Sequence, residues 1–327
     1  MKQVVRWGIL APGGISGAFA AALHQAEGAE LAAVGSRDLD RARAFASKYG
    51  MSRAHGSYAD LAADPGVDAI YIGTPHAFHE RDTILCLGQG KHVLCEKPFA
   101  INAAEGRRMV QAAGENDRLL MEAMWTRFLP SLEHMQKVIG AGLIGEPRTL
   151  TADFGIRPEF DPHSRLFDPW LGGGALLDLG VYAVSLSSWL FGNPVDIKGT
   201  ANLGPTGVDD DSAFVLRHTG GQMTNAFQSF RVQTPREAVI QGTEGWVKLH
   251  EPWWGTSRLT IQTAVAEPET LEFSLRGGGY THMAEAFMEL IRTGQRDSGV
   301  MPLAESLTIM ETMDILRRQW GQKYPME

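Results

Sequence analysis

The sequence predicts an α/β protein with two domains: a doubly wound parallel sheet in residues 1–123 and a mainly antiparallel sheet in residues 124–327. The first part alternates short, continuous apolar runs with longer helical patterns, which is typical of a parallel sheet covered by helices on both faces. The later part contains strand-like runs in series, joined by Gly and Asp turns, which is typical of antiparallel pairing. A chain of 327 residues is also longer than one core usually supports.

The first domain is expected to begin with a strand and then to alternate helices with strands. Its strands are apolar runs such as "VVRWGIL", and its second helix is expected to end at Gly50. We predict strands over 4–10, 30–36, 68–75, 91–97 and 118–124, and helices over 15–25, 40–50, 76–90 and 102–116.

The second domain is expected to place two helices and an irregular segment before its sheet. The run "ALLDLGVYAVSLSSWLFG" is apolar nearly all round, which indicates a helix buried in a core. In the region from 195 to 275 we predict strands over 212–218, 222–230, 237–242, 245–251, 257–264 and 270–275, and two helices close the chain. We predict helices over 130–145, 175–192, 281–294 and 302–321, with an irregular segment over 155–174.

The composition is that of an ordinary globular protein, with 44% hydrophobic and 21% charged residues. The net charge of −8 disfavours nucleic acid and anionic membranes as main partners. No apolar run approaches the ~20 residues that span a bilayer, and the first residues lack the pattern of a signal peptide. Cys86 and Cys95 are too few for a disulfide scaffold or a cysteine zinc site, so we expect a cytoplasmic protein.

A weakened form of the dinucleotide-binding (Rossmann) fingerprint follows the first strand. The pattern G-x-G-x-x-G falls on "APGGIS", in which Ala11 and Ser16 replace the outer glycines and Gly13 is retained. Gly13 would let the backbone approach a pyrophosphate, which would rest on the N-terminus of the following helix. A glycine-rich turn without a ligand is the alternative.

The end of the second strand predicts which nicotinamide cofactor is bound. In "VGSRD", Gly35 and Ser36 stand where an NAD-binding acid is expected, and Arg37 follows. Arg37 and Arg41 could clamp a 2′-phosphate, because a planar guanidinium matches phosphate oxygens. NADP is therefore predicted as the preferred cofactor, with NAD possible, unless Arg37 is merely solvated. Asp38 is expected to cap the next helix.

Two more segments end strands at the edge where open α/β sheets bind ligands. In "IGTPHAFH", Thr74, Pro75 and His76 are expected near the cofactor; His76 and His79 have metal-ligand spacing but no evident third ligand, so no metal is predicted. In "EKP", proline holds Lys97 extended, and a partly desolvated lysine there could hydrogen-bond a substrate oxygen. An ordinary exposed lysine is the alternative.

A second candidate set lies in the apolar helix of the second domain. Asp178 and Tyr182 are four residues apart and share a helix face. Tyr182 would pass a proton and Asp178 would orient the substrate or tune the lysine; the alternative is a polar pair that joins two domains. Trp125 and Arg127 either line a pocket or fill the domain junction, and the acidic run at 208–212 is expected to be a turn between strands.

These motifs together resemble the Gfo/Idh/MocA family of oxidoreductases. "CEKPFA" (95–100) resembles the family's lysine motif and "GGGALLDLGVY" (172–182) its helix motif. A tyrosine where many members carry histidine, together with "MEAMWTRFLP" (121–130), resembles the branch of dimeric dihydrodiol dehydrogenases and NADP-dependent D-xylose dehydrogenases. The resemblance covers nearly the whole chain.

The resemblance implies an N-terminal Rossmann domain and a C-terminal α/β domain with an open sheet, through which members often form homodimers or higher oligomers. It implies catalytic roles for Lys97, Asp178 and Tyr182. Ser185 departs from the aspartate of many sugar-oxidising members, which weakens the transfer of inositol-type contacts. The candidate cofactor-binding residues are Ala11, Gly13, Gly14, Ile15, Ser36, Arg37, Arg41, Thr74, Pro75, His76, His79, Glu96, Lys97, Trp125 and Arg127, and the substrate candidates are Trp125, Phe154, Arg165, Asp178 and Tyr182.

The expected function is NADP(H)-dependent hydride transfer between nicotinamide and a secondary alcohol or carbonyl of a sugar, polyol or cyclic diol. Lys97 and Tyr182 would relay the hydroxyl proton. Two alternatives remain open: a reductase of anhydro- or keto-sugars, which shares the fold, cofactor and lysine, and a non-catalytic nucleotide-binding sensor.

Overall fold

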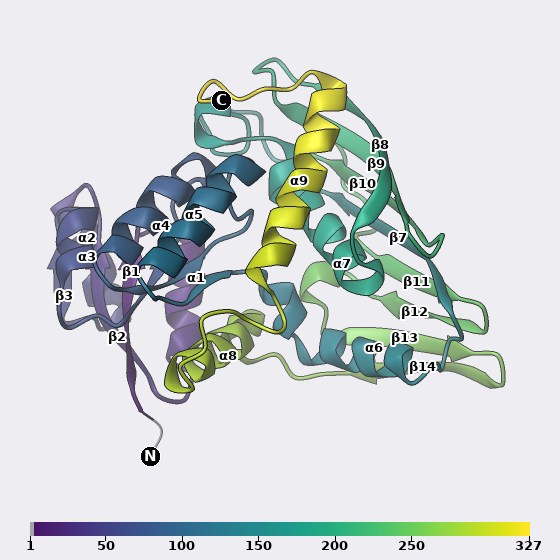
Figure 1. Cartoon of the computed structure of the whole chain (residues 1–327), viewed down its shortest axis with the longest axis horizontal. Coiled ribbons are helices and arrows are strands. Elements are labelled where there is room, and N and C mark those ends of the chain that lie inside the picture. Colours follow the sequence, from purple (N-terminus) through teal and green to yellow (C-terminus); the bar gives the residue numbers. More distant parts are fainter. Residues whose placement is uncertain (1–2) are drawn as a thin grey trace. The chain divides into compact units, whose positions relative to one another are not determined.

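The computed structural model describes residues 3–327, which form two compact units (Figure 1). The first unit runs to Phe128 and includes Arg276–Leu307; the second comprises Leu129–Leu275 and Thr308–Glu327. The domain boundary at residue 123 stays a prediction, and these units differ from it by grouping 276–307 with the first sheet.

Helix α8 (Tyr280–Arg292) explains why this late segment belongs to the first unit. Its Phe287 ring lies 5.4 Å from the ring of Trp7 in the first strand. The hydroxyl of Thr281 also donates to the carbonyl of Ala22 at 2.9 Å. Burial of these aromatic rings holds α8 against the first strand although the two are far apart in the sequence. No local pattern in the sequence predicts such a contact.

The first unit contains a six-stranded parallel sheet with the order β3-β2-β1-β4-β5-β6, which confirms the predicted doubly wound sheet. Strand β3 and the short helix α3 were not predicted, because three and six residues carry little periodic signal. The strands are β1 (Val5–Leu10), β2 (Ala29–Gly35), β3 (Arg53–His55), β4 (Ala69–Ile72), β5 (His92–Cys95) and β6 (Leu120–Glu122). The connecting helices are α1 (Gly14–Leu23), α2 (Leu39–Tyr49), α3 (Tyr58–Ala63), α4 (His79–Gly88) and α5 (Ala103–Glu115).

The core of the first unit is apolar on both sides of the sheet. Every residue of β4 is buried, as is typical of central parallel strands. On one side, the ring of Phe19 from α1 stacks on the ring of Tyr71 from β4 at 4.0 Å. The sheet therefore provides a rigid frame for the loops at its carboxyl edge.

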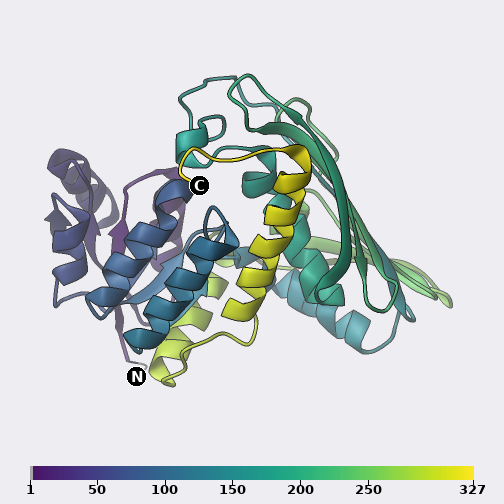
Figure 2. The ribbon, with the colours of Figure 1, turned by 45° about the horizontal axis from the view of Figure 1, so that its top comes forward.

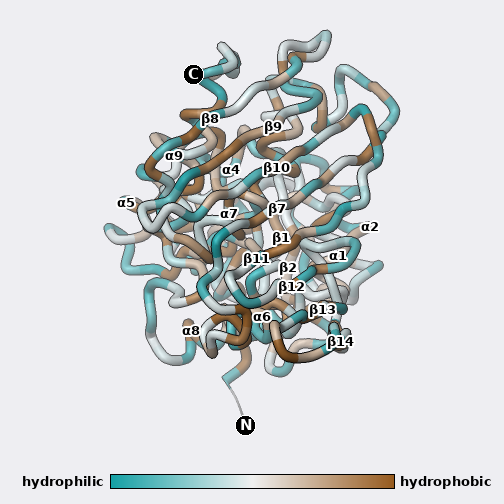
Figure 3. The backbone as a smooth tube through the Cα atoms, turned by 90° about the vertical axis from the view of Figure 1, so that its right-hand side faces the viewer, coloured by the Kyte–Doolittle hydropathy of each residue, from teal (hydrophilic) through white to brown (hydrophobic). Residues whose placement is uncertain are grey.

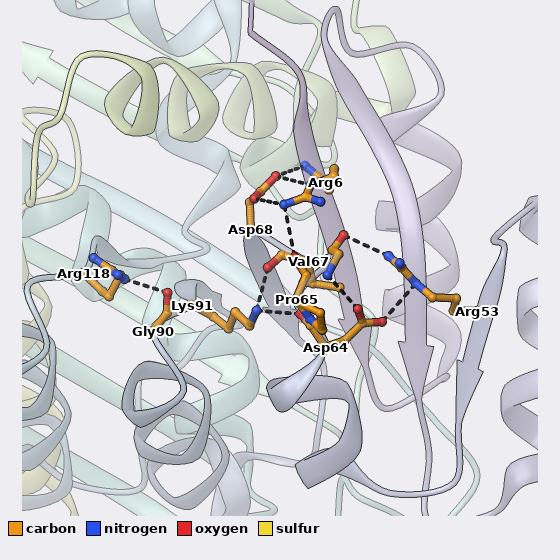
Figure 4. A network of polar contacts seen from close by, with 10 residues as sticks. Arg6, Arg53, Asp64, Pro65, Val67, Asp68, Gly90, Lys91 and Arg118 are labelled. Atoms are coloured by element: carbon orange, nitrogen blue, oxygen red, sulfur yellow. Dashed lines mark hydrogen bonds and ion pairs between the residues drawn. The ribbon is translucent and has the colours of Figure 1, made fainter.

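A polar network ties together the opposite, amino edge of this sheet (Figure 4). The Lys91 ammonium is buried and donates to the carbonyls of Asp64 at 2.6 Å and Val67 at 2.8 Å. Arg6 pairs with Asp68 at 2.7 Å, just before β4 begins. These bonds satisfy the backbone of the turn that enters β4, so this cluster has a structural role.

The second unit contains an eight-stranded sheet with the order β14-β13-β12-β11-β7-β10-β9-β8. Only β7 and β10 pair in parallel, which confirms the mainly antiparallel prediction. The strands are β7 (Pro147–Gly155), β8 (Pro194–Leu203), β9 (Asp209–His218), β10 (Met223–Ser229), β11 (Ala238–Gly242), β12 (Gly245–Leu249), β13 (Arg258–Thr263) and β14 (Ala266–Glu272).

Two strands of this sheet were not predicted. β7 alternates polar and apolar residues beside a long irregular segment, and β8 is an edge strand with no fully buried residue. β8 therefore lacks the apolar run that marks a buried strand, whereas the alternation in β7 is the pattern of a half-buried strand and could have identified it.

Helices α6 (Pro130–Gly140), α7 (Val181–Phe191) and α9 (Leu303–Trp320) lie on one face of this sheet (Figures 1 and 2). The predicted helix over 175–192 is divided into a π-helical turn, Leu176–Gly180, and α7. Among the described residues, Pro169–Phe191 alone is long and apolar enough to cross a membrane, and 83% of its most apolar window is buried within the protein.

Candidate active site

The turn after β1 has the backbone of a nucleotide-binding loop. Ala11 adopts a left-handed φ of 72°, at the position where the fingerprint normally has its first glycine. Gly13 caps the N-terminus of α1 with an extended φ of −117°, so its own conformation does not require glycine. A Cβ added at Gly13 or Gly14 would meet no atom within 4 Å. The glycines therefore fit a ligand that approaches the helix N-terminus closely.

The third glycine of the fingerprint is replaced by Ser16 without loss of close packing. The Ser16 hydroxyl donates to the Ala11 carbonyl at 2.6 Å and closes the turn. On its other side it faces Gly73, where an added Cβ would lie 2.2 Å from the Ser16 oxygen. Glycine at position 73 thus makes the room that Ser16 occupies, and holds α1 against the end of β4.

The loop after β2 presents arginine rather than acid. Arg37 and Arg41 are exposed, whereas Ser36 is buried. Asp38 caps α2, accepting from the backbone N–H groups of Asp40 at 2.9 Å and Arg41 at 3.2 Å, which confirms its predicted role. The nearest carboxylate is therefore engaged in the helix cap.

The loop after β4 brings Thr74, Pro75, His76 and His79 to the carboxyl edge of the sheet. His79 is fully buried, and its ring nitrogens lie 2.8 Å from the carbonyl of Pro98 and 3.0 Å from that of Thr74. It thereby fastens the loop after β4 to the loop after β5, a role that the sequence did not predict. The Thr74 hydroxyl is buried and has no hydrogen-bond partner among residues 3–327, as suits a group that meets a polar ligand.

The "EKP" segment directly follows β5. Lys97 is half-buried, a position that does not match an ordinary exposed lysine. The carboxylate of Glu96 is buried and accepts from the Tyr71 hydroxyl at 2.5 Å and from the Lys97 N–H at 3.2 Å. Glu96 thus fixes the backbone that carries the lysine.

Glu122, which was not among the predicted site residues, ends the neighbouring strand β6. It lies opposite Cys95 in the sheet and is completely buried. Burial raises its pKa to about 7, while Ser306 and the Arg127 guanidinium act in the opposite direction. An acidic residue within the apolar strand "LLMEAM", at the carboxyl edge of the sheet, is the feature of the sequence that could have identified this position.

Trp125 and Arg127 follow in the short helical turn Trp125–Phe128. The Trp125 ring lies 4.7 Å from the ring of Tyr280. The Arg127 guanidinium is almost fully buried and pairs with Glu305 at 2.6 Å. Both side chains are thus held within the first unit, and their contacts with a cofactor remain predictions.

In the second unit the structure brings four predicted residues together around the start of α7. Asp178 lies in the π-helical turn and pairs with Arg165 at 3.0 Å. The Tyr182 ring lies 5.9 Å from that of Phe154. The Trp254 ring stacks on the Phe154 ring at 3.3 Å and joins this cluster. A π turn beside such residues is a frequent feature of functional sites.

Comparisons with known proteins agree with this architecture. Residues 5–124 match the model of an oxidoreductase family with an NAD-binding Rossmann fold, and residues 132–248 match the GFO/IDH/MocA C-terminal domain. The human protein named trans-1,2-dihydrobenzene-1,2-diol dehydrogenase is 38% identical, over 99% of both chains.

Solved structures show the same fold at lower identity. A 3-ketoreductase from Actinomadura kijaniata in complex with NADP and TDP-benzene superposes with a TM-score of 0.85 at 24% identity, covering 97% of this chain and 98% of its own. Levoglucosan dehydrogenase in complex with NADH and levoglucosan superposes with a TM-score of 0.89 at 19% identity, covering 98% of both chains. The chain belongs to the Gfo/Idh/MocA family of NAD-binding oxidoreductases, as its motifs predicted.

Proposed function

We propose that this protein is an NADP(H)-dependent oxidoreductase acting on a secondary alcohol or carbonyl of a sugar, polyol or cyclic diol. The observation that carries the cofactor preference is the end of β2, where Ser36 and Arg37 stand in place of an acid and Asp38 is engaged in a helix cap. The diol substrate class is supported by the name of the human relative.

The cofactor is proposed to bind to the turn Ala11–Ser16 and to the loop after β4. The N–H groups at the start of α1 would meet the pyrophosphate, and Arg37 with Arg41 would bind the 2′-phosphate. Thr74, Pro75 and His76 would contact the nicotinamide half. When bound, the cofactor supplies hydride acceptance or donation.

The proton steps are assigned to Lys97 and Tyr182. Tyr182 would take the proton from the reacting hydroxyl and the Lys97 ammonium would stabilise the developing alkoxide. Asp178, which pairs with Arg165, would orient the substrate. Phe154 and Trp254 would give its carbon skeleton an apolar wall.

We further propose that the chain forms a homodimer or higher oligomer through the face of the second sheet opposite its helices. Figure 3 shows the backbone of β8, β9 and β10 facing the viewer, with hydrophobic and hydrophilic stretches following one another along these strands. Val215, Met223 and Phe227 are each at least 36% exposed there. Apolar side chains on a sheet face without helices suit contact with a second copy.

The cofactor proposal is tested by titrating NADPH and NADH into the wild type and Arg37→Ala. Loss of charge-assisted bonds should weaken NADPH binding by about 10- to 100-fold and leave NADH binding within about twofold. Arg43→Ala, which removes an exposed arginine paired with Asp40 on the same helix, is the matched control. Equal binding of NADPH by the wild type and Arg37→Ala would refute the assignment.

A further inference from the structure

The last residues of the chain pack against the glycine turn that leads to Asp178 and Tyr182. The Tyr324 hydroxyl donates to the carbonyl of Gly173 at 2.5 Å, and the Tyr324 side chain is 1% exposed. This bond satisfies a backbone group just before the π-helical turn. A residue 151 positions away in the chain therefore holds the turn that leads into the π-helical turn and α7.

Asp209, at the start of β9, holds the same helix start from another side. Its carboxylate accepts from the backbone N–H of Leu176 at 2.7 Å and from the Ser212 hydroxyl at 2.9 Å, and it is completely buried. The N–H groups of a first helical turn have no partner within the helix, so a buried cap is needed there. Burial raises the pKa of Asp209 to about 7, so the position also suits an uncharged acceptor.

The close approach of Asp209 and Tyr324 explains why the turn has glycine at position 174. Gly174 has a φ of 120°, and a Cβ added to it would lie 2.4 Å from the Asp209 carboxylate and 3.4 Å from the Tyr324 hydroxyl. A Cβ at Gly173 would lie 2.7 Å from the carbonyl of Leu166. The space between the turn, the tail and β9 therefore admits no side chain at Gly174, while the backbone of the preceding segment excludes one at Gly173.

The tail itself is fixed to α9 by Arg317. The guanidinium stacks over the Tyr324 ring at 4.8 Å. It also pairs with Glu327 at 2.8 Å and with Asp314 at 2.9 Å, and its side chain is only 4% exposed. Arg317 thus fixes the Tyr324 ring in the position from which its hydroxyl reaches the carbonyl of Gly173.

We propose that Tyr324 and Asp209 are positioning residues that fix the direction in which the π-helical turn presents Asp178 and Tyr182 to the substrate. This inference rests on the proposed function of Asp178 and Tyr182. A helix whose first turn loses an anchor can shift along its axis, and a misplacement of about 1 Å at reacting groups can cost about 100-fold in rate. Neither positioning residue needs to touch the substrate.

The test compares kcat, KM and NADPH affinity in Tyr324→Phe, Asp209→Ala and Asp209→Asn, using an oxidisable diol or sugar that the wild type turns over. Tyr324→Phe and Asp209→Ala should lose about tenfold or more in kcat while their NADPH Kd stays within about twofold. Asp209→Asn keeps an oxygen acceptor for Leu176 and should recover most of the wild-type kcat.

Ser187→Ala is the matched control, because it removes a buried hydroxyl from the same helix beyond Tyr182. The Ser187 hydroxyl lies 2.9 Å from Nε2 of His218 and 2.6 Å from the Thr224 hydroxyl. If this control lowers kcat as much as Tyr324→Phe, the effect is one of general helix stability and the inference is wrong. Hydrogen exchange over residues 175–185 should rise in Tyr324→Phe and Asp209→Ala but not in Asp209→Asn.

The outcomes separate the inference from the proposed function. A wild type that binds NADPH but turns over no diol, sugar or polyol in either direction would overturn the proposed function. A wild type that turns over while both Tyr324→Phe and Asp209→Ala keep its kcat would overturn the positioning role alone. Should Asp209→Ala not fold, Tyr324→Phe and Asp209→Asn still decide, since the inference requires a loss in the first and recovery in the second.

Discussion

At the scale of single residues, the candidate site depends on polar groups that are buried and held. Glu96 accepts from Tyr71 and from the backbone of Lys97, and His79 joins the loops on either side of it. A lysine on a fixed backbone loses less entropy when it meets a substrate than a free one. These contacts therefore fix the backbone that carries Lys97.

Lys97→Met is expected to lower kcat by about 10²–10⁴-fold, because it removes the proton relay and the charge beside the alkoxide. NADPH affinity and the free energy of unfolding should stay near their wild-type values. Steady-state kinetics with a parallel cofactor titration would check this. Lys48→Met, at an exposed position on α2, is the control, and near-normal turnover in Lys97→Met would remove the lysine from the mechanism.

Glu122→Gln is expected to change the pH dependence of stability. Because burial raises the pKa of Glu122 to about 7, the folded protein keeps this proton through a range where the unfolded chain has lost it. The free energy of unfolding should therefore fall as pH rises from the ordinary glutamate pKa of about 4.3 towards 7, and the loss is complete above that. Glutamine cannot ionise. The free energy of unfolding of Glu122→Gln, relative to that of the wild type, should therefore be higher at pH 8 than at pH 5. Urea unfolding at both values measures this, and parallel curves for the two proteins would contradict it.

At the scale of elements, the first sheet divides its tasks between its two edges. The carboxyl edge carries the turn after β1 and the loops after β2, β4 and β5, where ligands bind in open α/β sheets. The amino edge carries the Lys91 cluster of Figure 4, in which the Lys91 ammonium hydrogen-bonds two backbone carbonyls. Stability and function can therefore be perturbed separately.

Lys91→Met should destabilise the first unit by about 2 kcal/mol or more, because the buried carbonyls of Asp64 and Val67 lose their donor. NADPH affinity of the folded protein should not change, since the cofactor residues lie at the other edge. Chemical denaturation with Lys48→Met as the exposed control would measure the difference. A loss below about 0.5 kcal/mol, the range of ordinary surface changes, would show that the cluster is dispensable.

At the scale of the whole molecule, the proposed association depends on one face of the second sheet. Phe227, Met223 and Val215 lie on the same side of β9 and β10, since Phe227 pairs with Ala213 and Asn225 with Val215. Two copies that cover this side would remove the apolar area from water.

Phe227→Lys should therefore shift the protein towards monomer, because a charge placed in a packed apolar contact is costly. Sedimentation velocity over a range of concentrations would measure the shift. Val265→Lys, at a 95% exposed position in the turn before β14, is the control and should leave the association unchanged. A wild type that sediments as a monomer at all concentrations would refute the proposed interface.

The sequence by itself determined the parallel sheet of the first unit, the mainly antiparallel sheet of the second and the family. These follow from local information: continuous apolar runs for β1 and β4, the cap at Asp38, and the motifs around Lys97 and Tyr182. The placing of α8 with the first sheet, the strand β8, and the π turn at Asp178 were decided only by the tertiary structure.

The physical reason is that these features depend on contacts between residues far apart in the chain. Tyr324 meets Gly173, and Phe287 meets Trp7, across separations that no periodicity of the sequence records. Burial, which raises the pKa of Glu122 and Asp209, likewise arises only when distant segments exclude water from them. Local pattern therefore specified which elements form, and long-range packing decided which side chains they hold in place.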